Sequence, residues 1–125
     1  MMKRLLLALV LLIPGKAWAL CAGQATTPIF PFSFETLTVS NTALPITAAK
    51  LSTGDGIPPL AAYMTVETDS IRFRVDGLAP TATVGQLVTS GQTLEICGQN
   101  ALNKFRMIRV TTYSTVQYTV YKGTP

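Results

Sequence analysis

The sequence predicts an all-β domain, a single antiparallel β-sandwich or jelly-roll-like fold of about seven short strands. Apolar and polar residues alternate with a period of two along several runs, most clearly at Ile71–Val75. Glycine, proline and aspartate separate these runs at short intervals, and helical periodicity is almost absent. Short alternating runs between frequent turn residues are typical of a β-sandwich.

The first nineteen residues have the pattern of an export signal. Lys3 and Arg4 are followed by an apolar run at 5–13, and Ala-Trp-Ala at 17–19 fits the small-x-small cleavage pattern. A retained membrane anchor is the alternative, but a spanning helix needs about 20 apolar residues, and this run is shorter. We therefore expect residues 1–19 to be a cleaved signal peptide, with an exported, periplasmic or extracellular product that has no stable membrane insertion.

The next segment, residues 20–32, is expected to be an extended lead-in, and residues 33–125 the sandwich domain. The lead-in is rich in threonine, glycine and proline, and proline is excluded from central strands because it cannot donate to a ladder. A first strand is predicted at 34–40 and a weaker one at 46–51. Glycines and prolines at 52–59 then predict a loop.

The second half of the chain carries the clearest strands. After a strand at 61–68, the run 71–75 places Ile71, Phe73 and Val75 on one face, with arginines on the other. An Asp-Gly turn at 76–77 ends it. The remaining elements are expected to be a strand at 94–97, one helical turn or a loop at 98–103, and strands at 104–111 and 115–122.

The two cysteines are Cys21 and Cys97. In an exported protein we expect them to form a disulfide, because oxidising compartments favour pairing. Closing so long a loop would stabilise the fold by about 4 kcal/mol. The alternative is two free buried thiols in a protein that stays in a reducing compartment.

The charge of the predicted mature chain gives no reason to expect a nucleic-acid partner. The full chain has a formal net charge of +4. Removal of residues 1–19 takes Lys3, Arg4 and Lys16 with it, which leaves seven basic and six acidic residues. A net charge of +1 lacks the excess of cations that binding to phosphate backbones requires.

The composition also limits the possible chemistry. The chain has no histidine, which excludes histidine-based nucleophile pairs, histidine general bases and histidine-ligated metals. No phosphate-binding glycine motif is present, so we expect no cofactor. A carboxylate pair at Glu67 and Asp69 is the remaining route to hydrolysis, but a turn at Asp69 and a cross-strand ion pair of Glu67 with Arg72 or Arg74 is the stronger interpretation of these acids. We therefore predict that the protein is not an enzyme.

Four arginines form the candidate binding face. Arg72 and Arg74 share one face of a predicted strand, and Arg106 and Arg109 lie near the end of the chain. Together they could contact phosphate, a sulfated glycan or an acidic protein surface. The alternative is a solvated sheet face on which the arginine stems cover apolar neighbours.

A longer stretch carries a family resemblance. The segments Val66–Gly85 and Phe105–Arg109, above all Ile-Arg-Phe-Arg-Val-Asp-Gly at 71–77, resemble small β-rich proteins of tailed bacteriophages and prophages. The likeness continues through 91–94 and into the alternating strand at 115–121. It implies a virion-associated β-sandwich, such as a capsid decoration, head-fibre or tail accessory protein, and it implies no catalytic residues.

Two functions of different classes follow. The first is a structural or accessory β-domain of phage type, which self-associates or packs onto a larger assembly and is located in the virion. The second is an exported module that binds a glycan or a cell-envelope protein, through the Arg72 and Arg74 face or the loops at 52–59 and 77–85.

Overall fold

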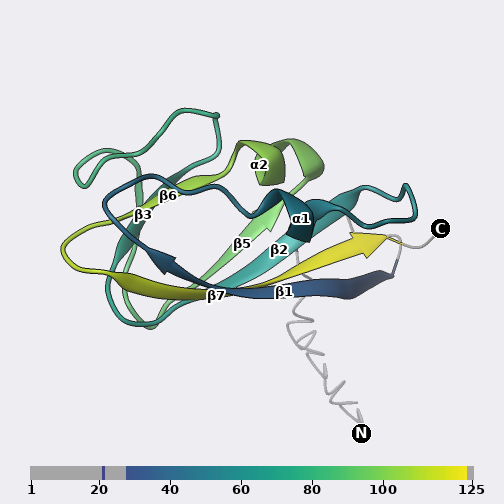
Figure 1. The fold of residues 1–125 in the computed structure, drawn as a ribbon, viewed down its shortest axis with the longest axis horizontal. Coiled ribbons are helices and arrows are strands. Elements are labelled where there is room, and N and C mark those ends of the chain that lie inside the picture. The colour runs from purple at the N-terminus through teal and green to yellow at the C-terminus, as the bar shows by residue number, and fades with distance from the viewer. Residues whose placement is uncertain (1–20, 22–27, 124–125) are drawn as a thin grey trace, which may run out of the picture.

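The computed structural model describes Cys21 and residues 28–123, and it shows two antiparallel sheets packed into a sandwich (Figure 1). The predicted all-β class is therefore confirmed. The predicted signal peptide, residues 1–19, lies outside the described residues, as do residues 20 and 22–27 of the predicted lead-in.

The larger sheet has the strand order β1-β7-β2-β5 and the smaller sheet the order β4-β3-β6. The strands of the larger sheet are β1 (Ile29–Val39), β2 (Pro59–Val66), β5 (Thr93–Cys97) and β7 (Ser114–Gly123). Those of the smaller sheet are β3 (Ile71–Arg74), β4 (Gln86–Val88) and β6 (Arg106–Arg109). Two short helices, α1 (Ala48–Leu51) and α2 (Gln99–Lys104), complete the described elements. Neither helix has the length and apolarity of a membrane-spanning segment.

The core forms on the inner face of the larger sheet. Alternate residues of β7, namely Val116, Tyr118 and Val120, are buried there, and Met64 and Val66 of β2 lie beside them. Because side chains alternate between the two faces of a strand, the intervening residues of β7 point outward. The period of two in the sequence thus selects the face that is buried.

The smaller sheet covers only part of this inner face, because its strands are three or four residues long. It contributes Ile71 and Phe73 of β3 and Met107 of β6 to the core. Figure 1 shows α1 and α2 above the rest of the larger sheet. Leu102 of α2 is buried there, and the ring of Phe105 stacks on Phe73 with the ring centroids 5.6 Å apart. The helices thus complete the second layer.

The structure differs from the predicted elements at four places. The weak strand predicted at 46–51 is wrong, because its second half is the helix α1, whose Ala-Ala-Lys-Leu sequence consists of good helix formers. Strand β4 was not predicted, since three residues are too few to show a period. Strand β3 ends at Arg74, so Val75 is 40% exposed rather than core-facing.

The fourth difference concerns the start of the first strand. Strand β1 begins at Ile29, inside the predicted lead-in, rather than at residue 34. It accommodates Pro31 because it is an edge strand, and its register with β7 shifts between Pro31 and Ser33. The proline therefore limits the position of the strand in the sheet and does not prevent it from forming.

The predicted disulfide is confirmed. Cys21 and Cys97 are bonded, with their Cα atoms 5.6 Å apart and 76 positions apart in sequence. Cys97 ends β5 at one edge of the larger sheet, whereas the chain after Cys21 leads into β1 at the opposite edge. The disulfide therefore attaches a residue that precedes β1 in sequence to β5, the opposite edge strand of the same sheet.

We expect reduction of this disulfide to lower the free energy of unfolding by about 2–4 kcal/mol, because the unfolded chain regains the entropy that the closed loop removes. Urea unfolding of the full chain with and without reductant measures the difference. A Cys21→Ala, Cys97→Ala double variant is the control, since its unfolding midpoint should not respond to reductant. An unchanged midpoint for the native protein after full reduction would contradict the expectation.

Candidate functional site

The register of the smaller sheet separates the four arginines of the candidate binding face. Arg106 lies directly opposite Arg74, so these two and Arg72 share the outer face of the sheet. Arg109 lies opposite Ile71, which is fully buried. Because opposite residues in an antiparallel pair share a face, Arg109 belongs to the other face, at the margin of the sheet. The structure therefore brings three of the four together.

Arg72 holds the loop between β3 and β4 against the outer face of the smaller sheet. Its Nε donates to the carbonyl oxygen of Ala82 at 2.9 Å, and its Nη1 donates to that of Gly85 at 2.8 Å. Gly85 has φ +131°, and a Cβ there would lie 3.0 Å from the carbonyl oxygen of Phe73 and 3.1 Å from Cβ of Pro80. The loop thus approaches the strand closely at a position that only glycine fits.

The other three arginines also have partners within the chain. Arg74 forms an ion pair with Asp76, whose pKa is lowered by the hydrogen bond from this guanidinium. Arg106 donates to the carbonyl oxygen of its neighbour Phe105 at 2.9 Å. The guanidinium of Arg109 lies over the ring of Tyr113, 4.6 Å from its centroid. Each of these guanidiniums thus has a partner within the chain. The contacts favour a role of the arginines in stabilising the fold and do not indicate a site for an anion.

The two acids considered for catalysis have structural contacts. Glu67 accepts a hydrogen bond from the side-chain amide of Gln117 at 2.6 Å. Asp69 accepts from the backbone amides of Thr111 at 3.1 Å and Thr112 at 2.6 Å, and the amide of Thr112 is the main cause of its lowered pKa. A carboxyl group that acts as a general acid near neutral pH needs a raised pKa instead. The geometry favours the turn interpretation of this pair.

A polar contact that the sequence did not indicate lies between the larger sheet and α1. The hydroxyl of Tyr118, whose side chain is buried, donates to a carboxylate oxygen of Glu35 and accepts from the backbone amide of Thr47 at 3.3 Å. Burial, and then the bond to Glu35, raise the pKa of Tyr118 to about 12. The alternation at 115–122 identified Tyr118 as core-facing, but its partners are distant in sequence.

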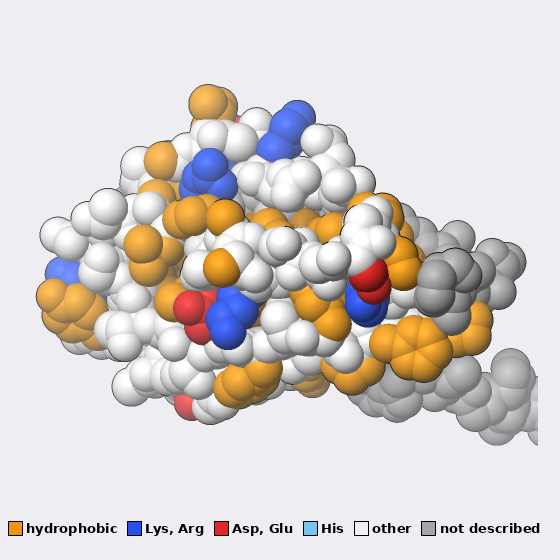
Figure 2. All heavy atoms as spheres, turned by 45° about the vertical axis from the view of Figure 1, so that its right-hand side comes forward, with side chains coloured by type: hydrophobic (Ala, Val, Ile, Leu, Met, Phe, Trp, Pro, Cys, Tyr) orange, Lys and Arg blue, Asp and Glu red, His pale blue; other side chains and the backbone are white. Residues whose placement is uncertain are grey.

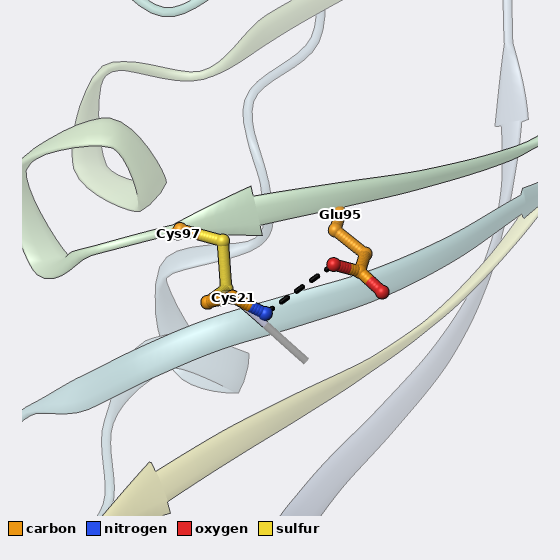
Figure 3. A group of neighbouring side chains, drawn as sticks. All are labelled: Cys21, Glu95 and Cys97. Carbon is orange, nitrogen blue, oxygen red and sulfur yellow. Dashed lines mark hydrogen bonds between the residues drawn. A yellow bond between two sulfur atoms is a disulfide. The ribbon is translucent and has the colours of Figure 1, made fainter. Parts of the chain in front are cut away.

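Cys21, Glu95 and Cys97 lie together at the edge of β5 (Figure 3). The backbone amide of Cys21 donates to the carboxylate of Glu95 at 3.3 Å. Both sulfur atoms are joined in the disulfide, so neither is a thiolate that could ligate a metal. The group therefore fixes the N-terminal side of the domain onto β5.

Exposed apolar side chains gather in two parts of the chain. The first, which we call the loop surface, consists of Val75, Leu78, Val84 and Leu87. Two of these, Val75 and Val84, line an open hollow of about 400 Å³ beside the ion pair of Arg74 and Asp76. Figure 2 shows one face of the molecule, on which exposed hydrophobic side chains lie between several Lys, Arg, Asp and Glu side chains.

The second exposed apolar region lies on β1. Phe30 is 47% exposed and Phe34 54% exposed, at the free edge of the larger sheet. Phe34 borders a hollow of about 290 Å³ together with Pro31, Phe32 and Ser33. The sequence predicted a strand that includes Phe34 but assigned Phe30 to the lead-in. Because apolar residues in a strand are usually buried, nothing in the pattern marked Phe34 as exposed.

Comparison of the chain with known proteins finds no matching family model, no matching curated protein and no matching solved structure. The interpretation of the two exposed regions therefore depends on their geometry and on the residues that they present.

We expect Arg72→Met to lower the free energy of unfolding by about 1–3 kcal/mol, because two carbonyl groups lose a charged donor. Hydrogen exchange at 80–85 should also accelerate, since the loop loses its attachment to β3. Arg74→Met is the matched control: its partner Asp76 is exposed, so the loss should be smaller and the loop should stay protected. Equal effects of the two substitutions would contradict this role of Arg72.

We expect Tyr118→Phe to lower the free energy of unfolding by about 1–2 kcal/mol, because Glu35 and the amide of Thr47 lose a partner. The substitution should also change the response to alkali. The folded protein keeps the Tyr118 proton up to a pKa of about 12, whereas the unfolded chain releases it near the ordinary value of 10.0. Stability should therefore fall as the pH rises from about 10 towards 12.

Urea unfolding of both proteins between pH 9 and pH 12 measures this contribution as the difference between their slopes. The native protein should lose more stability than the variant over that interval. Parallel pH profiles would show that Tyr118 does not carry the alkaline sensitivity.

Proposed function

We propose that this chain is a non-enzymatic structural or accessory β-domain that attaches to a larger assembly. The observation that carries the proposal is the loop surface, where Leu78, 60% exposed, and three other apolar side chains lie on one loop and the strand that follows it. Apolar groups concentrated in this way are typical of protein contact sites. Burial of one such side chain contributes about 1.5–3 kcal/mol.

The loop is held in one conformation before any partner binds. Arg72 bonds two of its carbonyl groups, and the backbone groups of Thr81 and Val84 exchange hydrogen bonds of 2.9 Å and 3.3 Å. The side-chain hydroxyl of Thr81 also accepts from the amides of Thr83 and Val84. A surface ordered in advance loses little conformational entropy on binding, so more of its apolar contact energy remains as affinity.

The resemblance of residues 66–85 and 105–109 to small phage proteins supports a phage particle as the larger assembly. We propose a virion-associated role, as a capsid decoration, head-fibre or tail accessory protein. The resembling stretch includes Arg72, Val75, Leu78, Val84 and Gly85, so it covers most of the loop surface and the contacts that hold the loop.

A second candidate is an exported module that binds a glycan or an envelope protein. The observation that favours it is the disulfide between Cys21 and Cys97, which suits an oxidising compartment. The arginine face gives it less support, because each of these guanidiniums has a partner within the chain.

We expect the chain to be a multicopy component of phage-type particles. Particles released by a bacterial strain that carries the coding sequence are purified on a density gradient. Peptides from residues 28–123 are then quantified in the particle band by mass spectrometry. A Leu78→Glu, Val84→Glu double variant should be depleted from the particles at least about tenfold, because it places charges in the apolar contact. Thr83→Glu adds a charge at an exposed position of the same loop and is the control that should remain incorporated.

Two results would overturn the proposal. One is the absence of the chain from purified particles while it accumulates as a soluble species in the periplasm or the medium, which would favour the binding module. The other is equal incorporation of the double variant and the control, which would remove the loop surface from the contact. Urea unfolding of both variants establishes that they fold.

A further inference from the structure

The edges of the two sheets are not equally protected. Strand β6 is covered, because the amide and carbonyl of Met107 both bond Leu44, at 2.9 Å and 2.8 Å, and the amide of Arg109 bonds the carbonyl of Ser40. Strand β4 has only three residues. At β5, Cys21 is attached by the disulfide, and Glu95 places a charge in the middle of the strand. These features are the usual means by which proteins prevent strands from pairing between molecules.

Strand β1 differs from these three edges. It is the longest strand described, with eleven residues, and nothing in the described part of the chain pairs with its outer side. Its exposed residues after the bulge, Phe34, Thr36 and Thr38, carry no charge. The strand does contain Pro31, a bulge and one acid, Glu35, but the proline and the bulge precede these residues, and the carboxylate of Glu35 accepts the hydrogen bond from Tyr118. A long edge whose exposed residues are uncharged and partly apolar favours the addition of another strand.

The direction of the backbone groups along β1 follows from the neighbouring ladder. The amide of Glu67 donates to the carbonyl of Thr115 at 2.9 Å, so Thr115 of β7 points its backbone groups towards β2. Amide and carbonyl of one residue point the same way in an antiparallel ladder, and successive residues alternate. Hence the backbone groups of Val116 and Tyr118 point towards β1.

The partners of these two residues in β1 are Leu37 and Glu35, which must point back towards β7. The intervening residues Phe34, Thr36 and Thr38 therefore direct both amide and carbonyl to the free edge. The same alternation directs the carbonyl of Ser40 away from β7, where it accepts the hydrogen bond from β6.

We propose that two copies of this chain associate through β1, antiparallel and about a two-fold axis at Thr36, so that their larger sheets form one continuous sheet. Thr36 of one copy lies opposite Thr36 of the other, and Phe34 lies opposite Thr38 in both directions. Each of these pairs exchanges two backbone hydrogen bonds. The contact is isologous, because the same segment serves both copies.

The surrounding residues select this register. An axis at Glu35 would place two carboxylates directly opposite each other, and like charges in that position are unfavourable. An axis at Phe34 would extend the pairing into the bulge between Pro31 and Ser33. An axis at Thr38 would require the carbonyl of Ser40, which is already bonded to Arg109. Only the axis at Thr36 pairs the three edge-directed residues with one another and needs no group from the bulge or from Ser40.

A second copy fits this edge better than an unrelated extended peptide does. An antiparallel copy about Thr36 pairs the three edge-directed residues with one another and places Glu35 opposite Leu37, so that no charged side chain lies opposite another. The exposed ring of Phe34 in each copy lies beside the hollow of about 290 Å³, where the association can shelter it from water. This contact lies on the larger sheet and does not involve the loop surface, so it stands independently of the proposed particle contact.

Sedimentation velocity of the disulfide-intact protein over a range of concentrations tests the proposal. The native chain should form a dimer and no larger series. Thr36→Lys should weaken the dimer, because it places two ammonium groups opposite each other. Thr65→Lys is the control: it adds the same charge on the same face of the sheet, two strands further in, and should leave the dimer intact. Thr36→Pro removes the edge-directed amide without touching the ladder to β7, and it should weaken the dimer about tenfold or more.

The outcomes are decisive in either direction. A native protein that is monomeric at every concentration up to about a millimolar, where even weak contacts are populated, overturns the inference. So does a dimer that persists in Thr36→Lys, or that dissociates equally in Thr65→Lys. If Thr36→Pro fails to fold, the comparison of Thr36→Lys with its control Thr65→Lys decides whether β1 forms the dimer contact. Particle incorporation of a Thr36→Lys monomer separates this contact from that of the loop surface.

Discussion

Burial of the inner face of β2 and β7 is the interaction on which the rest of the fold depends. These two central strands bring Met64, Val66, Val116 and Val120 together, and water must be excluded from this apolar surface. The smaller sheet is too short to cover it, so α1 and α2 complete the layer (Figure 1). The two short helices therefore cover the part of the larger sheet that the smaller sheet leaves open.

The shortness of the smaller sheet also explains why its arginines make contacts within the chain. A short sheet leaves the β3–β4 connection without backbone partners of its own over much of its length. Arg72 supplies donors from the outer face of β3, and Gly85 allows the chain to approach the strand. Arg72, a residue of the predicted binding face, thus holds the loop that carries the exposed apolar side chains Leu78 and Val84.

The two edge strands of the larger sheet, β1 and β5, differ in how well they are protected from pairing with another strand. At β5 the disulfide and Glu95 protect the edge, whereas the exposed residues of β1 after the bulge, Phe34, Thr36 and Thr38, are uncharged.

The sequence by itself determined the elements that have a strong local signal. Alternation identified β3 and β7 with their buried faces, turn residues separated the strands, and the two cysteines predicted a disulfide. It could not distinguish a short strand from a helix at 46–51, because so few residues show no period.

Only the tertiary structure decided what the exposed and polar side chains do. Arg109 left the arginine face because the register placed it opposite Ile71, and Tyr118 found Glu35 across the sheet. Phe34 and Leu78 are exposed because of where their segments lie, at a free edge and on a loop. Periodicity specifies which side of a strand a residue takes, but the neighbours on that side come from distant parts of the chain, and only folding brings them together.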